Sequence, residues 1–147
     1  MSGNFSYKIH CELIITSEIL TPAQISEIIN IKATRSYTKG DVFKSNTSGT
    51  EGKRINNLWA VKSDEILTNE ENISIHLQYF IDLLSNKTQL ISDLRNAPTN
   101  DVSFWVWIES NELGISTEMS ERELSFLNKI VNRLHFTILS PMKRNSI

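Results

Sequence analysis

The chain has 147 residues, of which 39% are hydrophobic and 22% are charged, and its formal net charge at pH 7 is −2. A chain of this length can bury one core without disulfides or metal, and no apolar run approaches the roughly 18 residues that a membrane span requires. The first residues contain neither a basic region nor a long apolar stretch, so we expect no secretory signal. The lone cysteine, Cys11, also fits a reducing compartment. We therefore expect a single cytoplasmic domain over residues 1–147 that does not associate with membranes.

The charges are unevenly distributed along the chain. Residues 1–60 carry seven Lys and Arg against five Asp and Glu, whereas residues 61–147 carry eight against twelve. The basic excess lies in a polar segment, residues 32–57. The acidic candidates for a charged patch are Asp64, Glu65, Glu70, Glu71, Glu118 and Glu121. Most such runs are solvated surface, and the alternative is an acidic patch that meets a basic partner.

The first third of the chain predicts a strand followed by a helix and a long loop. Apolar residues alternate with polar ones from Tyr7 to Ile15, which predicts a strand with one buried face. Thr21, Pro22 and Gln24 form a capping box with proline at the first helical position, so a short helix should begin there. The composition of residues 32–57 is rich in Gly, Ser, Thr and Asn and predicts a mobile loop.

The middle of the chain predicts a short strand followed by helices. Residues 58–62 are apolar enough for a strand, and Asn69 or Asn72 could open a helix with an apolar stripe that reaches Leu84. The polar residues 85–87 should interrupt this helix before its apolar pattern resumes.

The last third predicts a hairpin, a capped helix and a final strand. Residues 104–108 are aromatic and β-branched, and a turn should connect them to a second strand over Leu113–Thr117. Ser120 and Glu123 form another capping box. The strand over residues 135–139 ends before Pro141, and we expect the tail from residue 142 to 147 to be frayed.

The chain also contains two similar segments. Residues 13–28 and 113–127 each read as a strand that runs into a capped helix, with one residue dropped in the second copy. The order of elements predicts an α+β fold in which helices cover one face of a mainly antiparallel sheet, with a ferredoxin-like character. The strand order stays open at this level.

Sequence patterns of enzymes are sparse. The chain lacks a Walker phosphate loop, a Gly-x-Ser-x-Gly elbow and the His and Cys spacings that hold metals, so we expect no catalytic residues, cofactor or metal. Cys11 lies in an apolar strand and is a poor nucleophile. His10 and His135 could approach each other as a metal or catalytic pair, and the alternative is a pair of ordinary sheet histidines.

Two groups of residues are candidates for binding. Trp105 and Trp107 share one side of a strand whose other side is also apolar, so they should lie on the open face of the sheet among polar residues. Such tryptophans are typical anchors for a protein partner, although the 32–57 loop or a second copy in a homodimer could cover them instead. Stacking of nucleic-acid bases would need a basic groove that the chain does not supply, so we expect no direct nucleic-acid binding.

The second group surrounds Gly40 in the polar segment and mixes hydrogen-bond donors with an acceptor. Its members are Arg35, Tyr37, Lys39 and Asp41, and Trp59 could complete a small-molecule pocket beside them. The alternative is a turn with solvated charges.

Several motifs resemble a bacterial family known as domain of unknown function 4279, and the similarity spans nearly the whole chain. They are Leu20-Thr21-Pro22 with Ile25 and Ile31, Lys39-Gly40-Asp41, Leu58-Trp59-Ala60-Val61, Ile75-His76-Leu77 with Leu83-Leu84, and Leu124, Leu127, Leu134 and Phe136. The resemblance carries over no catalytic residues, and small bacterial proteins of this type often look like immunity proteins encoded beside secreted toxins. We therefore expect a non-enzymatic immunity protein that binds a cognate toxin such as a nuclease. The alternative is a small-molecule-binding domain or unrecognised enzyme with a pocket near residues 32–59.

Overall fold

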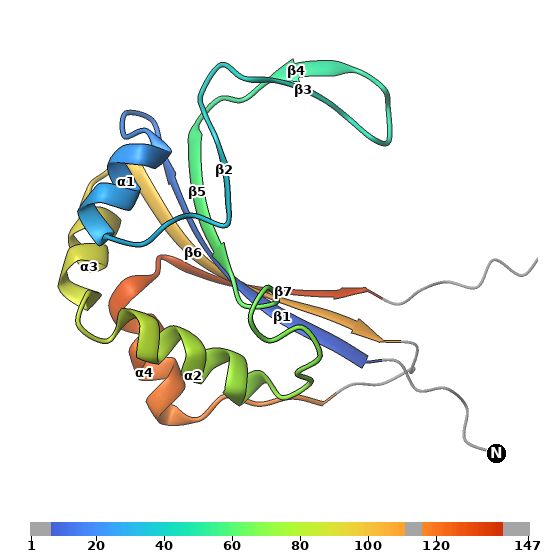
Figure 1. Cartoon of the computed structure of the whole chain (residues 1–147), viewed down its shortest axis with the longest axis vertical. Coiled ribbons are helices and arrows are strands. Elements are labelled where there is room, and N and C mark those ends of the chain that lie inside the picture. Colours follow the sequence, from blue (N-terminus) through green and yellow to red (C-terminus); the bar gives the residue numbers. More distant parts are fainter. Residues whose placement is uncertain (1–6, 111–115, 140–147) are drawn as a thin grey trace, which may run out of the picture.

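The computed structural model describes residues 7–110 and 116–139 (Figure 1). The strands are β1 (Tyr7–Ser17), β2 (Arg35–Tyr37), β3 (Val42–Lys44), β4 (Glu51–Lys53), β5 (Asn57–Lys62), β6 (Asn100–Ser110) and β7 (Arg133–Leu139). The helices are α1 (Pro22–Ile29), α2 (Ile73–Leu84), α3 (Thr88–Asn96) and α4 (Glu121–Ile130). No helix in these ranges is long and apolar enough to cross a lipid bilayer.

The main sheet has five strands in the order β2-β5-β1-β6-β7, and β3 and β4 form a separate hairpin. The central strand β1 is antiparallel to both β5 and β6, whereas β7 returns parallel to β6 after α4. The α+β fold with a mainly antiparallel sheet is confirmed, and this strand order resolves what the sequence left open.

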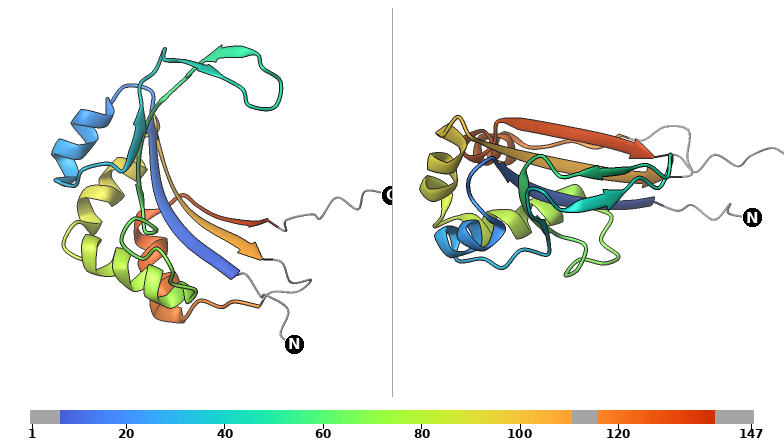
Figure 2. Two further views of the ribbon diagram at one scale, coloured as in Figure 1. Left: turned by 45° about the vertical axis from the view of Figure 1, so that its right-hand side comes forward. Right: turned by 90° about the horizontal axis from the view of Figure 1, so that it is seen from above.

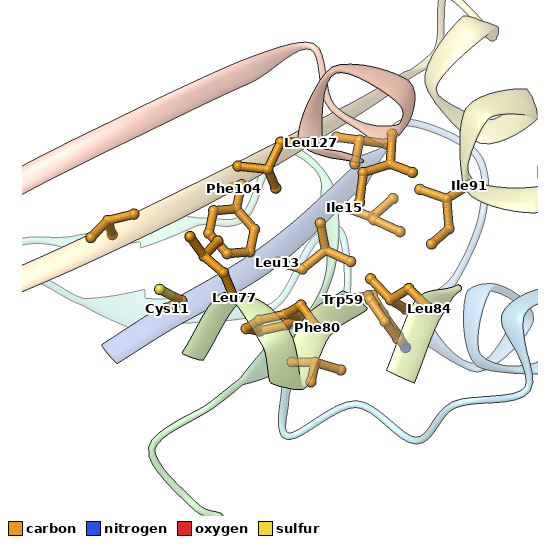
Figure 3. Packing of buried hydrophobic residues seen from close by; sticks show 14 of the residues in the cluster. Cys11, Leu13, Ile15, Trp59, Leu77, Phe80, Leu84, Ile91, Phe104 and Leu127 are labelled. Carbon is orange, nitrogen blue, oxygen red and sulfur yellow. The ribbon is translucent and has the colours of Figure 1, made fainter. Parts of the chain in front are cut away.

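All four helices cover one face of the sheet (Figures 1 and 2). Alternate residues of β1, including Cys11, Leu13 and Ile15, point to this side and are fully buried (Figure 3). Phe80 of α2 packs edge-to-face on Phe104 of β6, with 5.1 Å between ring centroids. Burial of each large apolar side chain contributes about 1.5–3 kcal/mol, so this layer is the main source of stability.

Side-chain hydrogen bonds cap the starts of α1, α2 and α4, whereas α3 begins at Thr88 without one. Thr21 and Gln24 form the expected capping box at α1, and Ser120 and Glu123 form the one at α4. Asn72 caps α2, because its side chain accepts the N–H of Ser74. Each cap satisfies a backbone donor that has no partner within its own helix.

Two segments differ from expectation or fall outside the described residues. Residues 32–57 contain three short strands where a loop was expected, because β2 pairs with β5 and β3 pairs with β4. The predicted strand Leu113–Thr117 lies mostly outside the described residues, and residues 116–120 have no regular structure. The tail over residues 142–147 also lies outside them.

The sheet is curved, and its uncovered face is the concave one (Figures 1 and 2). The hairpin of β3 and β4 projects on this concave side, at the end of the sheet where β5 begins. The face without helices is therefore bounded at one end by an arm of the same chain.

Candidate functional site

The uncovered face of the sheet contains the two tryptophans that the sequence singled out. In the register of the sheet, Trp107 lies opposite His10 of β1, and Trp105 lies opposite Glu12 of β1 and His135 of β7. Both indoles are partly exposed, whereas their neighbours on the other side of β6 are buried under the helices. The structure thus places Trp105 and Trp107 on the concave face.

Four aromatic rings form a continuous row across this face. The centroid distances are 6.0 Å from His10 to Trp107, 5.4 Å from Trp107 to Trp105 and 4.0 Å from Trp105 to His135, and each pair is nearly parallel. The two histidines lie at opposite ends of the row, so they do not form a pair. In the part of the chain that the structure describes, no three His, Cys, Asp or Glu side chains come close enough to hold a metal ion.

An apolar strip continues this row toward the hairpin. Trp105 and Tyr37 both pack against a small buried cluster on the uncovered face, made of Ile14, Leu58 and Ala60. The guanidinium of Arg54 then lies between the rings of Tyr37 and Phe43, 4.1 Å from each centroid. Cation–π contacts of this kind fix the hairpin against the sheet. We call the whole feature, from Phe43 through Tyr37 to Trp107, the aromatic strip.

A charge pair lies beside the strip. Arg35 donates to both carboxylate oxygens of Glu12, from Nε at 3.0 Å and from Nη2 at 3.2 Å. Glu12 is only 2% exposed, while Arg35 is 41% exposed. The fork of the guanidinium matches the carboxylate, so Arg35 satisfies an otherwise costly buried charge.

A hollow of about 410 Å³ lies at the end of the face away from the hairpin. Its lining includes Lys8, His10, Trp107 and Glu109 from the sheet, together with Asp64, Thr68 and Asn69 from the loop between β5 and α2. Nε1 of Trp107 and Oδ1 of Asp64 are buried without a hydrogen-bond partner among the described residues. Such groups are candidates for contact with a molecule that enters the hollow.

The protonation of His10 follows from its place in the hollow. Burial lowers the pKa of His10 below its ordinary value, and the nearby carboxylate of Asp64 partly opposes this effect. His10 is therefore mostly neutral at physiological pH, and its ring stacks on Trp107 as an uncharged group.

The loop that borders the hollow is held by a buried hydrogen-bond chain that sequence reasoning missed. His76 donates from Nε2 to the carbonyl of Glu70 at 2.8 Å, and its Nδ1 accepts the hydroxyl of Ser63 at 2.6 Å. The Oγ of Ser63 in turn accepts the N–H of Cys11 at 2.9 Å. One signal was available in the sequence, because His76 lies on the apolar stripe of its helix. Burial also raises the pKa of the Cys11 thiol well above its usual range, which leaves it unreactive.

The Lys39-Gly40-Asp41 motif forms a turn at the base of the hairpin. The Lys39 N–H donates to Oδ1 of Asn57, and Oδ2 of Asp41 accepts the N–H of Thr38, each at 2.8 Å. Gly40 has φ of 92° and donates its N–H to the carbonyl of Arg54. The backbone N–H groups of Lys39 and Gly40 and the carboxylate of Asp41 are thus engaged in fixing the chain direction.

Trp59 lies on the opposite side of the sheet from Arg35. It is fully buried in the helix-covered core, where its Nε1 donates to Oγ of Ser26 at 2.9 Å. The register places Arg35 beside Ala60, so its side chain is on the uncovered face. The structure therefore does not gather Arg35 and Trp59 around one pocket.

The acidic candidates fall into two places. Asp64, Glu65, Glu70 and Glu71 lie on the loop between β5 and α2, whereas Glu118 precedes α4 and Glu121 begins it. Oε2 of Glu70 accepts the N–H groups of Glu71 and Asn72, so this residue shapes the loop. Glu65 and Glu71 are exposed on this loop. Burial raises the pKa of the phenol of Tyr79 on α2, and the nearby carboxylate of Glu65 adds to this effect.

Comparison with known proteins gives a family match. A family model described as "Domain of unknown function (DUF4279)" matches residues 7–140. No curated protein and no solved structure matches the chain.

Proposed function

The chain belongs to the DUF4279 family, and because this description names no activity, we propose a function from the uncovered sheet face. The protein is a non-enzymatic binding module, and more specifically a bacterial immunity protein that neutralises a cognate toxin in the cytoplasm by covering it.

The aromatic strip is the observation that carries this proposal. Tryptophan, tyrosine and arginine are the residues that dominate binding energy in protein interfaces. Here Trp105, Trp107, Tyr37 and Arg54 lie in one strip on a face that no helix of the described chain covers. A concave face of this kind suits a convex protein surface.

The charges around the face favour a basic partner at one end. The loop from residue 64 to 71 contains four acidic residues and no Lys or Arg, and it borders the hollow. Complementary charge speeds association and selects partners. A basic toxin, such as a nuclease that binds nucleic acid itself, would present suitable lysine and arginine side chains to this loop.

The buried polar groups argue against a hydrolytic role. Ser63 and His76 are spaced as a nucleophile and a base would be, but both are fully buried, so no substrate reaches them. Their hydrogen bonds hold the loop that borders the hollow, which is a structural task.

The hollow supports a second candidate function, the binding of a small polar molecule. Its volume falls within the range of ligand pockets, and Trp107 Nε1 and Asp64 Oδ1 lack partners beside it. This alternative places a ligand at the far end of the sheet, away from residues 32–59.

Co-expression with the product of the neighbouring gene tests the first proposal. We expect a stoichiometric complex, and toxicity to the host when this chain is omitted. The double variant Trp105→Ala/Trp107→Ala should lose co-purification while it keeps its far-UV circular dichroism spectrum. Leu90→Ala is the matched control, because it removes an exposed apolar side chain from the helix layer.

A harmless neighbour that does not bind would refute the toxin proposal. A thermal-shift screen of the chain with small polar compounds then tests the second candidate, since a ligand of the folded state raises the unfolding temperature.

A further inference from the structure

Two segments of opposite charge flank the uncovered face. Residues 32–57 carry six Lys and Arg against two acidic residues, and residues 64–71 carry four acidic residues with no basic one. The first segment leads into β5 and the second follows it, so they lie at opposite ends of one strand. A strand of this length separates its two ends by about 20 Å.

Each of these segments also exposes large apolar side chains. Val42 and Ile55 at the hairpin are 63% and 80% exposed, and Ile66 on the acidic loop is 67% exposed. Isolated exposed apolar residues are ordinary, but here they stand beside a basic excess in one segment and an acidic excess in the other. Lys44, Lys53 and Glu51 lie on the same side of the hairpin as Val42, because Val42 pairs with Lys53 and Lys44 pairs with Glu51, so the charges on this side remain basic by one.

We propose that a second copy of this chain covers the face, and that the β3–β4 hairpin of each copy docks on the acidic loop and hollow of the other. One chain carries both halves of the contact, so the pairing is reciprocal and closes as a two-fold dimer. Lys44 and Lys53 of one copy meet Glu65 and Glu71 of the other, and Val42 and Ile55 meet Ile66.

The charges select one of the possible two-fold arrangements. In one arrangement, the two-fold axis lies between the facing sheets and runs perpendicular to β5, so the basic end of each copy faces the acidic end of the other. In the second arrangement, the two-fold axis runs parallel to β5, so hairpin faces hairpin and acidic loop faces acidic loop. Repulsion between like charges disfavours the second arrangement. The curvature agrees with this choice, since two concave faces leave space that a projecting hairpin fills (Figure 2).

The hollow supplies polar groups for the incoming hairpin. Oδ1 of Asp64 has no hydrogen-bond partner among the described residues, and Glu109 on its border is exposed. The ammonium groups of the hairpin lysines suit both carboxylates. The dimer would also shield the aromatic strip from water, so a toxin that binds the strip would compete with the second copy for this face.

Sedimentation of the chain alone, over a range of protein concentrations and at low and high salt, tests this inference. We expect a dimer at high concentration that dissociates on dilution and at high salt, because the contact depends on charge. The measurement needs no toxin, so its outcome is independent of the proposed function.

Charge reversal locates the interface. Lys44→Glu/Lys53→Glu makes the hairpin acidic, and Glu65→Lys/Glu71→Lys leaves the loop with two acidic and two basic residues, which cancels its net negative charge. We expect each double variant to be a monomer, because neither keeps the attraction between a basic hairpin and an acidic loop. An equimolar mixture of the two variants should restore a heterodimer, since the wild-type hairpin of one variant meets the wild-type loop of the other, and the introduced glutamates meet the introduced lysines. All four positions are exposed, and unchanged circular dichroism spectra confirm that the variants fold.

Three results would overturn the inference. They are a wild-type chain that stays monomeric at every concentration, a dimer that survives both charge reversals, and a mixture of the variants that stays monomeric. Survival of the dimer in both variants would place the contact elsewhere, such as the edge strand β7.

Discussion

At the scale of single residues, the pair of Glu12 and Arg35 places a buried carboxylate beside a partly exposed guanidinium on the uncovered face. Arg35→Ala would leave a carboxylate that is 2% exposed without its partner. We expect the free energy of unfolding to fall by about 1–3 kcal/mol, less than for a fully enclosed pair because water reaches the site of Arg35. Urea unfolding measures this change.

The conservative variant separates charge from geometry. Arg35→Lys keeps the positive charge but cannot donate through two arms of a fork, so it should lose part of that stability. If Arg35→Ala unfolds at the same urea concentration as the wild type, the pair has no structural role.

His10 predicts a pH dependence of stability. Burial holds the pKa of His10 below its ordinary value, so the unfolded chain binds a proton at a higher pH than the folded chain does. Stability from this group is therefore present above about pH 6.5 and falls as the pH is lowered through the folded-state pKa. In His10→Gln this contribution is absent, so the fall in unfolding free energy below about pH 6.5 should be smaller than in the wild type. If the unfolding free energies of His10→Gln and the wild type change with pH in parallel, His10 is not the group responsible for this pH dependence.

At the scale of elements, the turn at Lys39-Gly40-Asp41 sets the direction of the hairpin. Gly40 has φ of 92°, and an added Cβ meets no atom within 4 Å, so the cost of Gly40→Ala is backbone strain alone. We expect a loss of about 1–2 kcal/mol in unfolding free energy, measured in urea. Lys39→Ala is the control and should change little, because only the backbone N–H of Lys39 is bonded. Equal stability of both variants would refute this account.

Elements that depend on neighbours in sequence could be predicted, whereas those that depend on distant pairing could not. The capping boxes at Thr21 and Ser120 join residues three apart, so the sequence contains the whole signal. The strand β2 has three residues, and it exists because β5 lies beside it. Nothing in those three residues distinguishes them from a loop.

The candidate site could be predicted only in part, because it also depends on pairing between strands that are distant in the sequence. Trp59 and Trp105 are both aromatic residues of apolar strands, and only the register against β1 puts Trp59 in the core and Trp105 on the uncovered face. The row of four rings joins three strands that are far apart in the chain. The alternation within residues 104–108 indicated a face for both Trp105 and Trp107, but not which rings would stack on them.

At the scale of the whole molecule, the proposed dimer couples stability to protein concentration. If unfolding also separates the two copies, each hundredfold increase in concentration adds about 2.7 kcal/mol to the stability of the dimer by mass action. We expect the thermal unfolding temperature of the wild type to rise with concentration, and to rise less at high salt, where the contact between hairpin and acidic loop is screened. Lys44→Glu/Lys53→Glu is the control, because it should unfold as a monomer at a temperature independent of concentration. The inference fails if the wild type shows no concentration dependence, or if the variant shows the same dependence as the wild type.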